Sequence, residues 1–75
     1  MRDRGAHEID PLTGAEAWVR KIQPYQATKR YVCPGCNQAL ERGVGHVVVI
    51  PVTDAALRRH WHHGCWAARR RRPLR

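Results

Sequence analysis

Two short stretches decide the fold: Cys33-Pro34-Gly35-Cys36 and, after 25 intervening residues, His62-His63-Gly64-Cys65. Zinc in structural sites takes four tetrahedral ligands, and three thiolates with one imidazole form a closed set of this kind. A two-residue gap in a turn lets both sulfurs of the first pair point at one ion. Positions three apart at the start of a helix share one face, so the second pair can reach the same ion. The sequence therefore predicts one Zn²⁺ per chain, held by Cys33, Cys36, His62 and Cys65.

The histidine ligand has to be chosen among His60, His62 and His63, which all lie near Cys65. On a helix, His63 would point away from Cys65, and His60 is a ligand only if it precedes the helix. His62 fits best, and His60 is the alternative. A redox dithiol is the other interpretation of CxxC, but no βαβ pattern surrounds the motif and Cys65 would then have no role. Because all four ligand positions are filled, a catalytic zinc is disfavoured.

The length of the chain makes a metal important for stability. Its 75 residues correspond to one small domain with or without tails. A core of this size rarely contributes more than about 3–5 kcal/mol, whereas zinc binding contributes roughly 10–16 kcal/mol in zinc-finger peptides. We therefore expect the metal-free chain to be largely unfolded around the site.

The chain divides into four expected regions: a flexible lead-in at 1–14, a short amphipathic helix at 15–24, a zinc-finger domain at 25–68 and a basic C-terminal tail at 69–75. The helix is predicted because four apolar residues recur at helical spacing, namely Ala15, Trp18, Val19 and Ile22. Thr13 is its expected N-cap, with Glu16 completing a capping box, and Pro24 ends it. A helix this short needs a docking surface, so Trp18 and Ile22 are candidate contacts with a partner.

Further along, residues 46–52 form the only β-branched run and predict a strand, which Pro51 places at the edge of a sheet. A helix is expected to begin near His62. The expected fold is thus a small zinc-stabilised α+β finger, with a CxxC turn, a β-hairpin and an HxxC pair at a helix start, preceded by the short N-terminal helix.

These residues carry a resemblance to known families. The CPGC turn, Leu40, Gly43, the strand and the segment Trp61-His62-His63-Gly64-Cys65-Trp66 resemble treble-clef-like fingers of the LIM and poly(ADP-ribose) polymerase types. That resemblance implies protein binding for LIM and DNA-end or nick binding for the polymerase fingers. The whole chain also resembles small Arg-rich proteins of high-GC actinobacteria, through an IQPYQA segment before CPGC and RRHWH before the last cysteine.

Charge points towards phosphate-rich partners. The formal net charge is +8, and residues 38–75 hold eight Lys or Arg against two Asp or Glu. Arginine is suited to bidentate phosphate contacts and to stacking on bases. Zinc would bring the basic residues that flank both ligand pairs together, forming a positive patch. The candidate nucleic-acid contacts are Lys29, Arg30, Arg58, Arg59, Arg69, Arg70, Arg71 and Arg72, with Trp66, Trp61 and Tyr31 as stacking surfaces.

The preferred function is therefore non-enzymatic binding of nucleic acid, either DNA or structured RNA, including ribosomal RNA. The alternative is a protein-interaction adaptor that docks by the finger and by Trp18 on a larger complex, including a ribonucleoprotein. A treble-clef nuclease of the HNH type would use His60 or His63 as general base, but Asn37 and Asp54 stand at no matching spacing for its second metal site. No small-molecule substrate is expected. No apolar run is long enough for a membrane span, and a leaderless Arg-rich chain indicates a cytoplasmic protein associated with nucleoid or ribosome.

Overall fold

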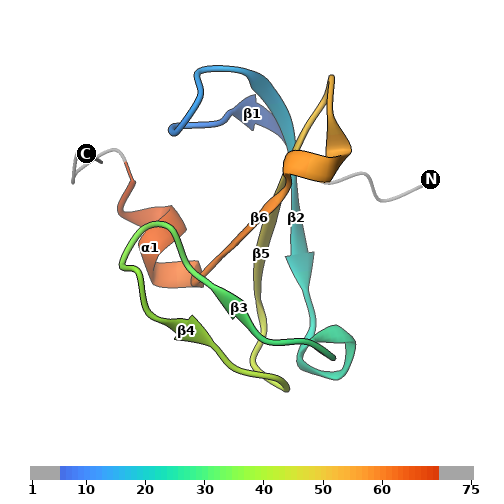
Figure 1. The fold of residues 1–75 in the computed structure, drawn as a ribbon, viewed down its shortest axis with the longest axis vertical. Coiled ribbons are helices and arrows are strands. Elements are labelled where there is room, and N and C mark those ends of the chain that lie inside the picture. Colours follow the sequence, from blue (N-terminus) through green and yellow to red (C-terminus); the bar gives the residue numbers. More distant parts are fainter. Residues whose placement is uncertain (1–5, 70–75) are drawn as a thin grey trace.

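A four-stranded antiparallel sheet forms the body of the molecule (Figure 1). The computed structural model describes residues 6–69. The strand order is β1-β2-β5-β6, with the strands spanning Ala6–Ile9, Glu16–Ile22, His46–Pro51 and Arg59–Trp61. Every neighbouring pair runs antiparallel. Short connections join β1 to β2 and β5 to β6, whereas the segment between β2 and β5 carries the second sheet.

A second, two-stranded sheet pairs β3 (Tyr31–Val32) with β4 (Ala39–Leu40). Together with helix α1 (His63–Ala67), this hairpin lies beside β6 (Figure 1). Two 3₁₀ turns, η1 (Pro24–Gln26) and η2 (Ala55–Leu57), connect the strands. Within residues 6–69, no helix is long and apolar enough to cross a lipid bilayer.

The expected helix at 15–24 is wrong, because this segment is strand β2. Its side chains alternate between the two faces of the sheet: Ala17 is buried in the core, whereas Trp18 contacts His7 on the opposite face. Spacing of three and four also fits a strand when apolar residues occupy both faces. Pairing with β1 on one side and β5 on the other supplies the backbone hydrogen bonds that a short helix would have had to make alone.

The prediction of a flexible lead-in is also wrong for residues 6–14, the part of it that the structure describes. Residues 6–9 form β1, and Asp10, which is 1% exposed, builds the turn that follows. Its side chain accepts a hydrogen bond from the Leu12 backbone at 2.8 Å, and its backbone N–H donates to Ala15 at 2.8 Å. The Thr13 hydroxyl accepts from Ala15 at 3.2 Å within this turn rather than capping a helix. The rest of the lead-in, residues 1–5, lies outside the described residues.

The strand predicted at 46–52 is confirmed as β5, but it is central rather than at an edge. Proline is tolerated because of where it stands. The backbone N–H of Val52 donates to Glu16 in β2 at 2.9 Å, so the Pro51 nitrogen faces the other way. On that side β6 begins only at Arg59, opposite Val49, and no strand residue lies opposite Pro51. No ladder hydrogen bond is lost.

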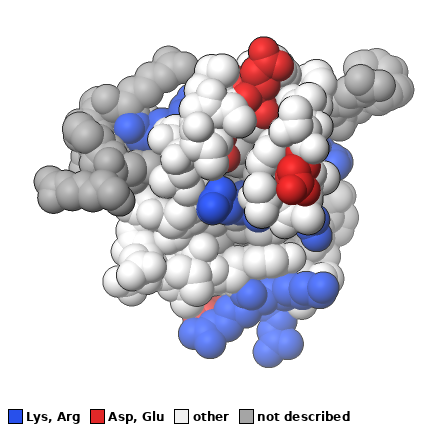
Figure 2. Space-filling model, turned by 45° about the horizontal axis from the view of Figure 1, so that its top comes forward, with Lys and Arg blue, Asp and Glu red and all other residues white. Residues whose placement is uncertain are grey.

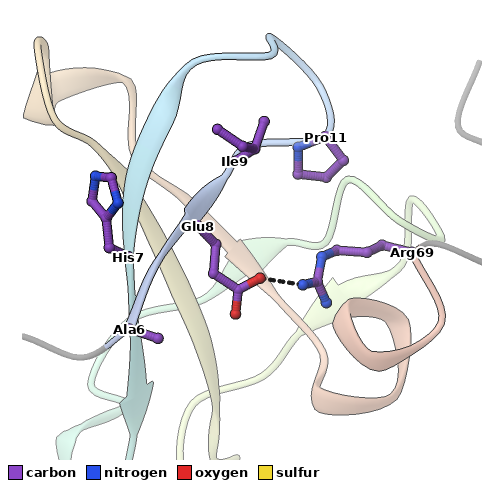
Figure 3. A pocket seen from close by; sticks show the side chains of 6 residues that line it. All are labelled: Ala6, His7, Glu8, Ile9, Pro11 and Arg69. Carbon is purple, nitrogen blue, oxygen red and sulfur yellow. Dashed lines mark hydrogen bonds and ion pairs between the residues drawn. The ribbon is translucent and has the colours of Figure 1, made fainter.

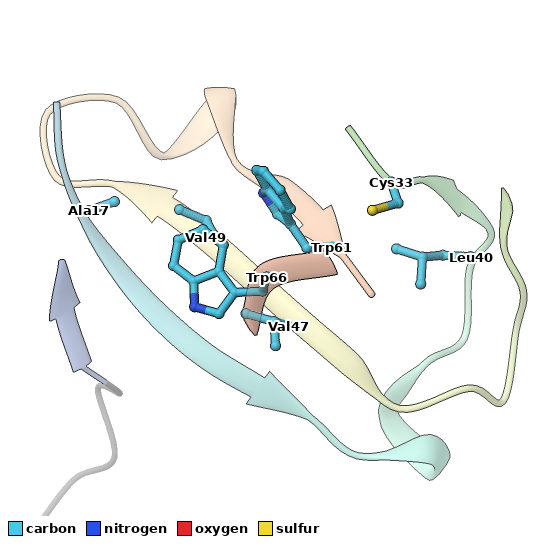
Figure 4. Packing of buried hydrophobic residues seen from close by; sticks show 7 residues of the cluster. All are labelled: Ala17, Cys33, Leu40, Val47, Val49, Trp61 and Trp66. Carbon is cyan, nitrogen blue, oxygen red and sulfur yellow. The ribbon is translucent and has the colours of Figure 1, made fainter. Parts of the chain in front are cut away.

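The hydrophobic core joins the sheet, the β3–β4 hairpin and α1 (Figure 4). Trp61 is fully buried and meets Trp66 edge to face, with ring centroids 5.2 Å apart. The other members of the cluster are Ala17, Cys33, Leu40, Val47 and Val49. Since Cys33 belongs to this cluster, the core is continuous with the cysteine and histidine residues described next.

Candidate metal centre

The first ligand pair lies in the tight turn that closes the β3–β4 hairpin. The backbone N–H of Cys33 donates to Gln38 at 2.9 Å, and that of Asn37 donates to Cys33 at 2.7 Å. Asn37 takes a positive φ of 62°, a conformation that asparagine tolerates better than most residues. Gly35 leaves room for the second pair, since a Cβ there would stand 2.9 Å from the Cys65 Cβ. The turn thus points Cys33 and Cys36 towards the start of α1.

The second pair comes from the junction between β6 and α1, as predicted from the HxxC spacing. His62 is the N-cap residue, and its carbonyl accepts a hydrogen bond from the Trp66 backbone at 3.0 Å. Cys65 follows in the first turn, so both side chains leave the helix on one face. The backbone N–H of His62 also donates to Cys33 Sγ at 3.4 Å, which ties the helix start to the hairpin turn.

The four side chains converge on one point. The ligand atoms of Cys33, Cys36, His62 and Cys65 all lie within 4.8 Å of one another. His62 Nδ1 is 3.3 Å from Cys36 Sγ and 3.9 Å from Cys65 Sγ. A tetrahedral zinc with ordinary Zn–S and Zn–N bonds separates its ligand atoms by roughly 3.5–3.8 Å. The geometry therefore fits one metal ion, and the donor set is that of a structural zinc site.

The structure places His62, rather than His60, in the cluster with the three cysteines. The Nε2 atom of His62 lies 3.2 Å from the carbonyl oxygen of Ala39 in β4. Carbonyl oxygens only accept, so Nε2 carries the proton and Nδ1 is left free to bind a metal. Such a hydrogen bond fixes the tautomer and orientation of a metal-binding imidazole. His60 is engaged elsewhere, as described below.

The thiol pKa values show why a cation belongs here. Burial raises the pKa of Cys33, but hydrogen bonds from the backbone N–H groups of His62, Cys36 and Gly35 together lower it to about 7. Burial and the neighbouring Cys36 and Cys33 sulfurs raise the pKa of Cys65 to about 12. Three crowded thiolates repel one another without a positive charge between them. A bound metal supplies that charge and displaces the protons.

The redox interpretation of CxxC is disfavoured by the same arrangement. Cys33, Cys36 and Cys65 are all free thiols. A dithiol pair needs only two of them, yet His62 and Cys65 are held against that pair. With four donors around one point, no ligand position is left open for water or substrate.

Of the residues expected to contact nucleic acid, Lys29, Arg30 and Arg58 are exposed. Arg30 forms an exposed ion pair with Glu41 at 3.2 Å, and the Arg58 Nη1 atom donates to the Ala55 carbonyl. Arg59 is half-buried. Arg70, Arg71 and Arg72 lie outside the described residues.

Arg69 and Trp66 are used inside the fold. The Arg69 guanidinium pairs with Glu8 of β1 (Figure 3), donates to the Trp66 carbonyl and lies 3.8 Å from the centroid of the Trp66 ring. The Arg69 side chain is only 11% exposed. Trp66 itself is 8% exposed and Trp61 fully buried, so neither ring has a free face for a base. Tyr31 is half-buried and stacked on His60.

Trp18 and Ile22, the expected docking residues, are half-buried on β2. The Trp18 ring meets His7 of β1 in a T-shaped contact with centroids 4.9 Å apart. Trp18 and Ile22 therefore belong to the face of the sheet that points away from α1, rather than to a separate helix.

Sequence reasoning missed a buried histidine pair, His46 and His60. His46 is 1% exposed; its Nδ1 lies 2.9 Å from the Val44 carbonyl and its Nε2 lies 2.8 Å from His60 Nδ1. Tyr31 stacks on His60 with centroids 3.5 Å apart. Burial, with His46 and Arg58 nearby, lowers the pKa of His60 to about 4. Alternation along β5 was the available signal, because it places His46 on the same face as buried Val48.

Comparison with known proteins places the chain in a family. The sequence model of the Rv1322 family protein matches residues 8–67. Uncharacterized protein Rv1322 of Mycobacterium tuberculosis and uncharacterized protein Mb1356 of Mycobacterium bovis are each 43% identical over 60 residues, which cover 75% of this chain and 61% of the relative. The chain therefore spans about three-fifths of the length of these relatives.

No solved structure gave a significant match. The family match agrees with the resemblance to small actinobacterial proteins, whereas the resemblance to LIM and polymerase fingers has no counterpart in these matches. With four-fifths of its residues, the metal ligands included, inside the matched region, the chain belongs to the Rv1322 family.

Proposed function

We propose that this protein is a non-enzymatic zinc finger that binds nucleic acid, either DNA or structured RNA, through a basic surface. The observation that carries the proposal is the excess of positive charge. Residues 6–69 hold eight Lys or Arg against five Asp or Glu, and the two flanking segments hold six against one. Such an excess attracts phosphate groups over several ångströms and steers association.

The order of the elements supports a treble-clef character. A hairpin that closes in the CxxC turn is followed by the β5–β6 hairpin and then by a helix whose start carries the second ligand pair. In this arrangement the zinc joins the first hairpin to the helix. Its role is then to hold the shape of the molecule, because the closed ligand set leaves no place for chemistry.

The candidate residues of a nuclease have other contacts in the fold. Within the part of the chain that the structure describes, the cysteine and histidine cluster is the one group of three or more side chains suited to a metal. Asp54 caps η2 by accepting from the Ala56 backbone, and His60 is held by His46. A second, catalytic metal centre has no support among these side chains.

The proposed nucleic-acid partner also implies where in the cell the protein acts. A basic protein that binds nucleic acid belongs in the cytoplasm, on the nucleoid or on ribosomes, and no small-molecule substrate is required. The family relatives are longer than the region that they share with this chain.

An adaptor role is the second candidate, and one surface favours it. Trp18, Ile22 and Ile50 are half-buried on the sheet face opposite α1. A protein partner could bury these side chains. Contacts of this kind persist at high salt, unlike contacts with phosphate.

The test is binding of the zinc-loaded chain to DNA and RNA, measured by fluorescence anisotropy across a salt series. The affinity should fall linearly with salt on a double-logarithmic plot, with a slope near −0.9 for each phosphate contact on duplex DNA. No binding at low salt would contradict the proposal. A protein partner that co-purifies at high salt after nuclease treatment would favour the adaptor role instead.

A further inference from the structure

The charge of the described residues is not spread evenly over the surface. Lys29, Arg30 and Arg42, against Glu41, fall in one short stretch of the chain and carry two of the three net positive charges of residues 6–69. Elsewhere in the described part, five basic residues face four acidic ones. In Figure 2, blue side chains gather along the lower edge, while red ones lie mainly in the upper half.

These basic residues meet at the open end of the β3–β4 hairpin. Tyr31 pairs with Leu40, so Arg30 and Lys29 leave the hairpin on one strand where Glu41 and Arg42 leave it on the other. The ion pair between Arg30 and Glu41 confirms that the two strands remain close there. All four side chains are exposed. The metal centre lies at the opposite, closed end of the same hairpin.

An exposed aromatic ring lies at the same end. Tyr25, in η1, is 81% exposed, the largest exposure of any large hydrophobic side chain among residues 6–69. The backbone N–H of Gly43 donates to Ala27 at 2.8 Å, which fastens the chain next to Arg42 onto the end of η1. A Cβ at Gly45 would stand 3.3 Å from Pro24, so the loop after Arg42 runs tightly along η1. Figure 1 shows η1 and this loop together at the lower end of the molecule.

Tyr25 differs from the other Trp and Tyr residues because its ring does not pack against another ring among residues 6–69. Trp61 and Trp66 are buried in the core, Tyr31 stacks on His60 and Trp18 contacts His7. No ring contact involves Tyr25 within the described residues. A tyrosine that contributes nothing to the core, at the end of the molecule from which three cations extend, matches the way proteins hold single-stranded nucleic acid, with bases stacked on rings and phosphates on Lys or Arg.

We propose that Tyr25, Lys29, Arg30 and Arg42, here called the basic end, bind unpaired nucleotides of a nucleic acid. This inference rests on the proposed function and names its substrate class. Tyr25 stacks on a base, and the three cations contact the phosphates on either side. A duplex offers phosphates but no free base face, so single strands bind more tightly. The zinc contributes indirectly, by fixing the hairpin whose open end is flanked by all three cations.

Anisotropy of labelled oligo(dT), oligo(rU) and a duplex of equal length, with the zinc-loaded chain, tests the inference. Tyr25→Ala should weaken single-strand binding at least about fivefold, as expected for loss of one stacked base, and Tyr25→Phe should retain it. Arg42→Ala should weaken binding and reduce the salt slope by about 0.7, the value for one phosphate on a single strand. The matched controls are Leu57→Ala, which removes an exposed apolar side chain beyond the far end of β5, and Arg20→Ala, which removes an equal charge from an exposed position on β2.

The controls should bind as the parent protein does. Circular dichroism and the zinc content confirm that each variant is folded. Three results would overturn this inference and leave nucleic-acid binding standing: single-strand binding that Tyr25→Ala leaves unchanged, duplex binding that is as tight, or an effect of Arg20→Ala equal to that of Arg42→Ala. A folded, zinc-loaded chain that binds none of the three probes at low salt would overturn both.

Discussion

Gly35 shows how a single residue determines whether the metal centre can close. It stands between Cys33 and Cys36, and a Cβ there would lie 2.9 Å from both the Cys65 Cβ and the Trp61 ring. Trp61 is fully buried and cannot move aside without opening the core. Only the absence of a side chain lets the hairpin turn approach the start of α1 this closely.

Replacement of Gly35 by Ala should therefore be destabilising, by about 1–3 kcal/mol, the usual cost of overpacking a close-packed core. Gly64→Ala is the matched control, because Gly64 also precedes a ligand but has no atom within 4 Å of its added Cβ. Alanine favours a helix, so this variant should be as stable as the parent or more so. Thermal unfolding of the zinc-loaded proteins measures both. Equal losses would mean that the space around Gly35 has no special role.

Residue-level pKa values also predict how zinc binding depends on pH. With the four side chains held together but no metal bound, the Cys65 thiol, with a pKa of about 12, is protonated throughout the neutral range. A thiol in the unfolded segment, with an ordinary pKa of about 8.5, is also mostly protonated there. Cys33, with a pKa of about 7, becomes protonated as well when the pH falls below 7. Zinc must displace these protons, so its affinity falls as the pH falls.

The expected result is a decrease of at least about tenfold per pH unit, since one displaced proton gives a tenfold change, with a steeper decrease below pH 7. Competition with a chromophoric chelator between pH 6 and 8 measures it. An affinity independent of pH would mean that zinc is not bound by thiolates.

At the scale of elements, two ion pairs of unequal burial show what holds β1 in place. Arg69, just after α1, pairs with Glu8 of β1, and the two side chains are 11% and 28% exposed. Arg30 and Glu41 form the same chemical pair with side chains 65% and 60% exposed. Burial strengthens the first pair and makes loss of one partner costly, whereas water screens the second.

Arg69→Ala should cost about 1.5–3 kcal/mol, as for the loss of a hydrogen bond to a charged group, and Arg30→Ala less than about 1 kcal/mol. Urea unfolding of the zinc-loaded chain compares the two. A double-mutant cycle with Glu8→Gln then isolates the pair from the stacking of Arg69 on Trp66. If both arginine variants lost the same stability, the Glu8–Arg69 pair would not be what fastens β1 to α1.

The elements also show how much of the fold could be predicted from the sequence. Ligand spacing predicted that Cys33, Cys36, His62 and Cys65 come together and that a helix starts there, and β-branched residues predicted β5, because these signals are local. Strand β2 was mistaken for a helix, since Trp18, Val19 and Ile22 suit both periods and only pairing with β1 and β5 decides between them. The internal use of Arg69 could not be predicted, because its partner Glu8 lies 61 residues away in the chain.

At the scale of the whole molecule, the metal centre is the point where three parts meet. The hairpin turn supplies Cys33 and Cys36, and the junction of β6 with α1 supplies His62 and Cys65. The core cluster runs through the same place. Two short strands and a five-residue helix would not persist alone in water, so the metal should stabilise this half of the molecule.

Removal of zinc by a chelator should therefore unfold the hairpin and α1, and Cys36→Ser should have the same effect without a chelator. The expected energetic scale is roughly 10–16 kcal/mol, that of structural zinc in small fingers. Amide hydrogen exchange locates the loss. Residues 31–40 and 61–67 should lose protection first, and a variant that stayed folded and kept one zinc would contradict the assignment of Cys36.

X-ray absorption spectroscopy at the zinc edge of the purified chain tests the central claim most directly. Coordination by Cys33, Cys36, Cys65 and His62 Nδ1 predicts three sulfur atoms at about 2.3 Å and one nitrogen at about 2.0–2.1 Å. A shell dominated by oxygen and nitrogen, or a protein that takes up no zinc, would contradict the account.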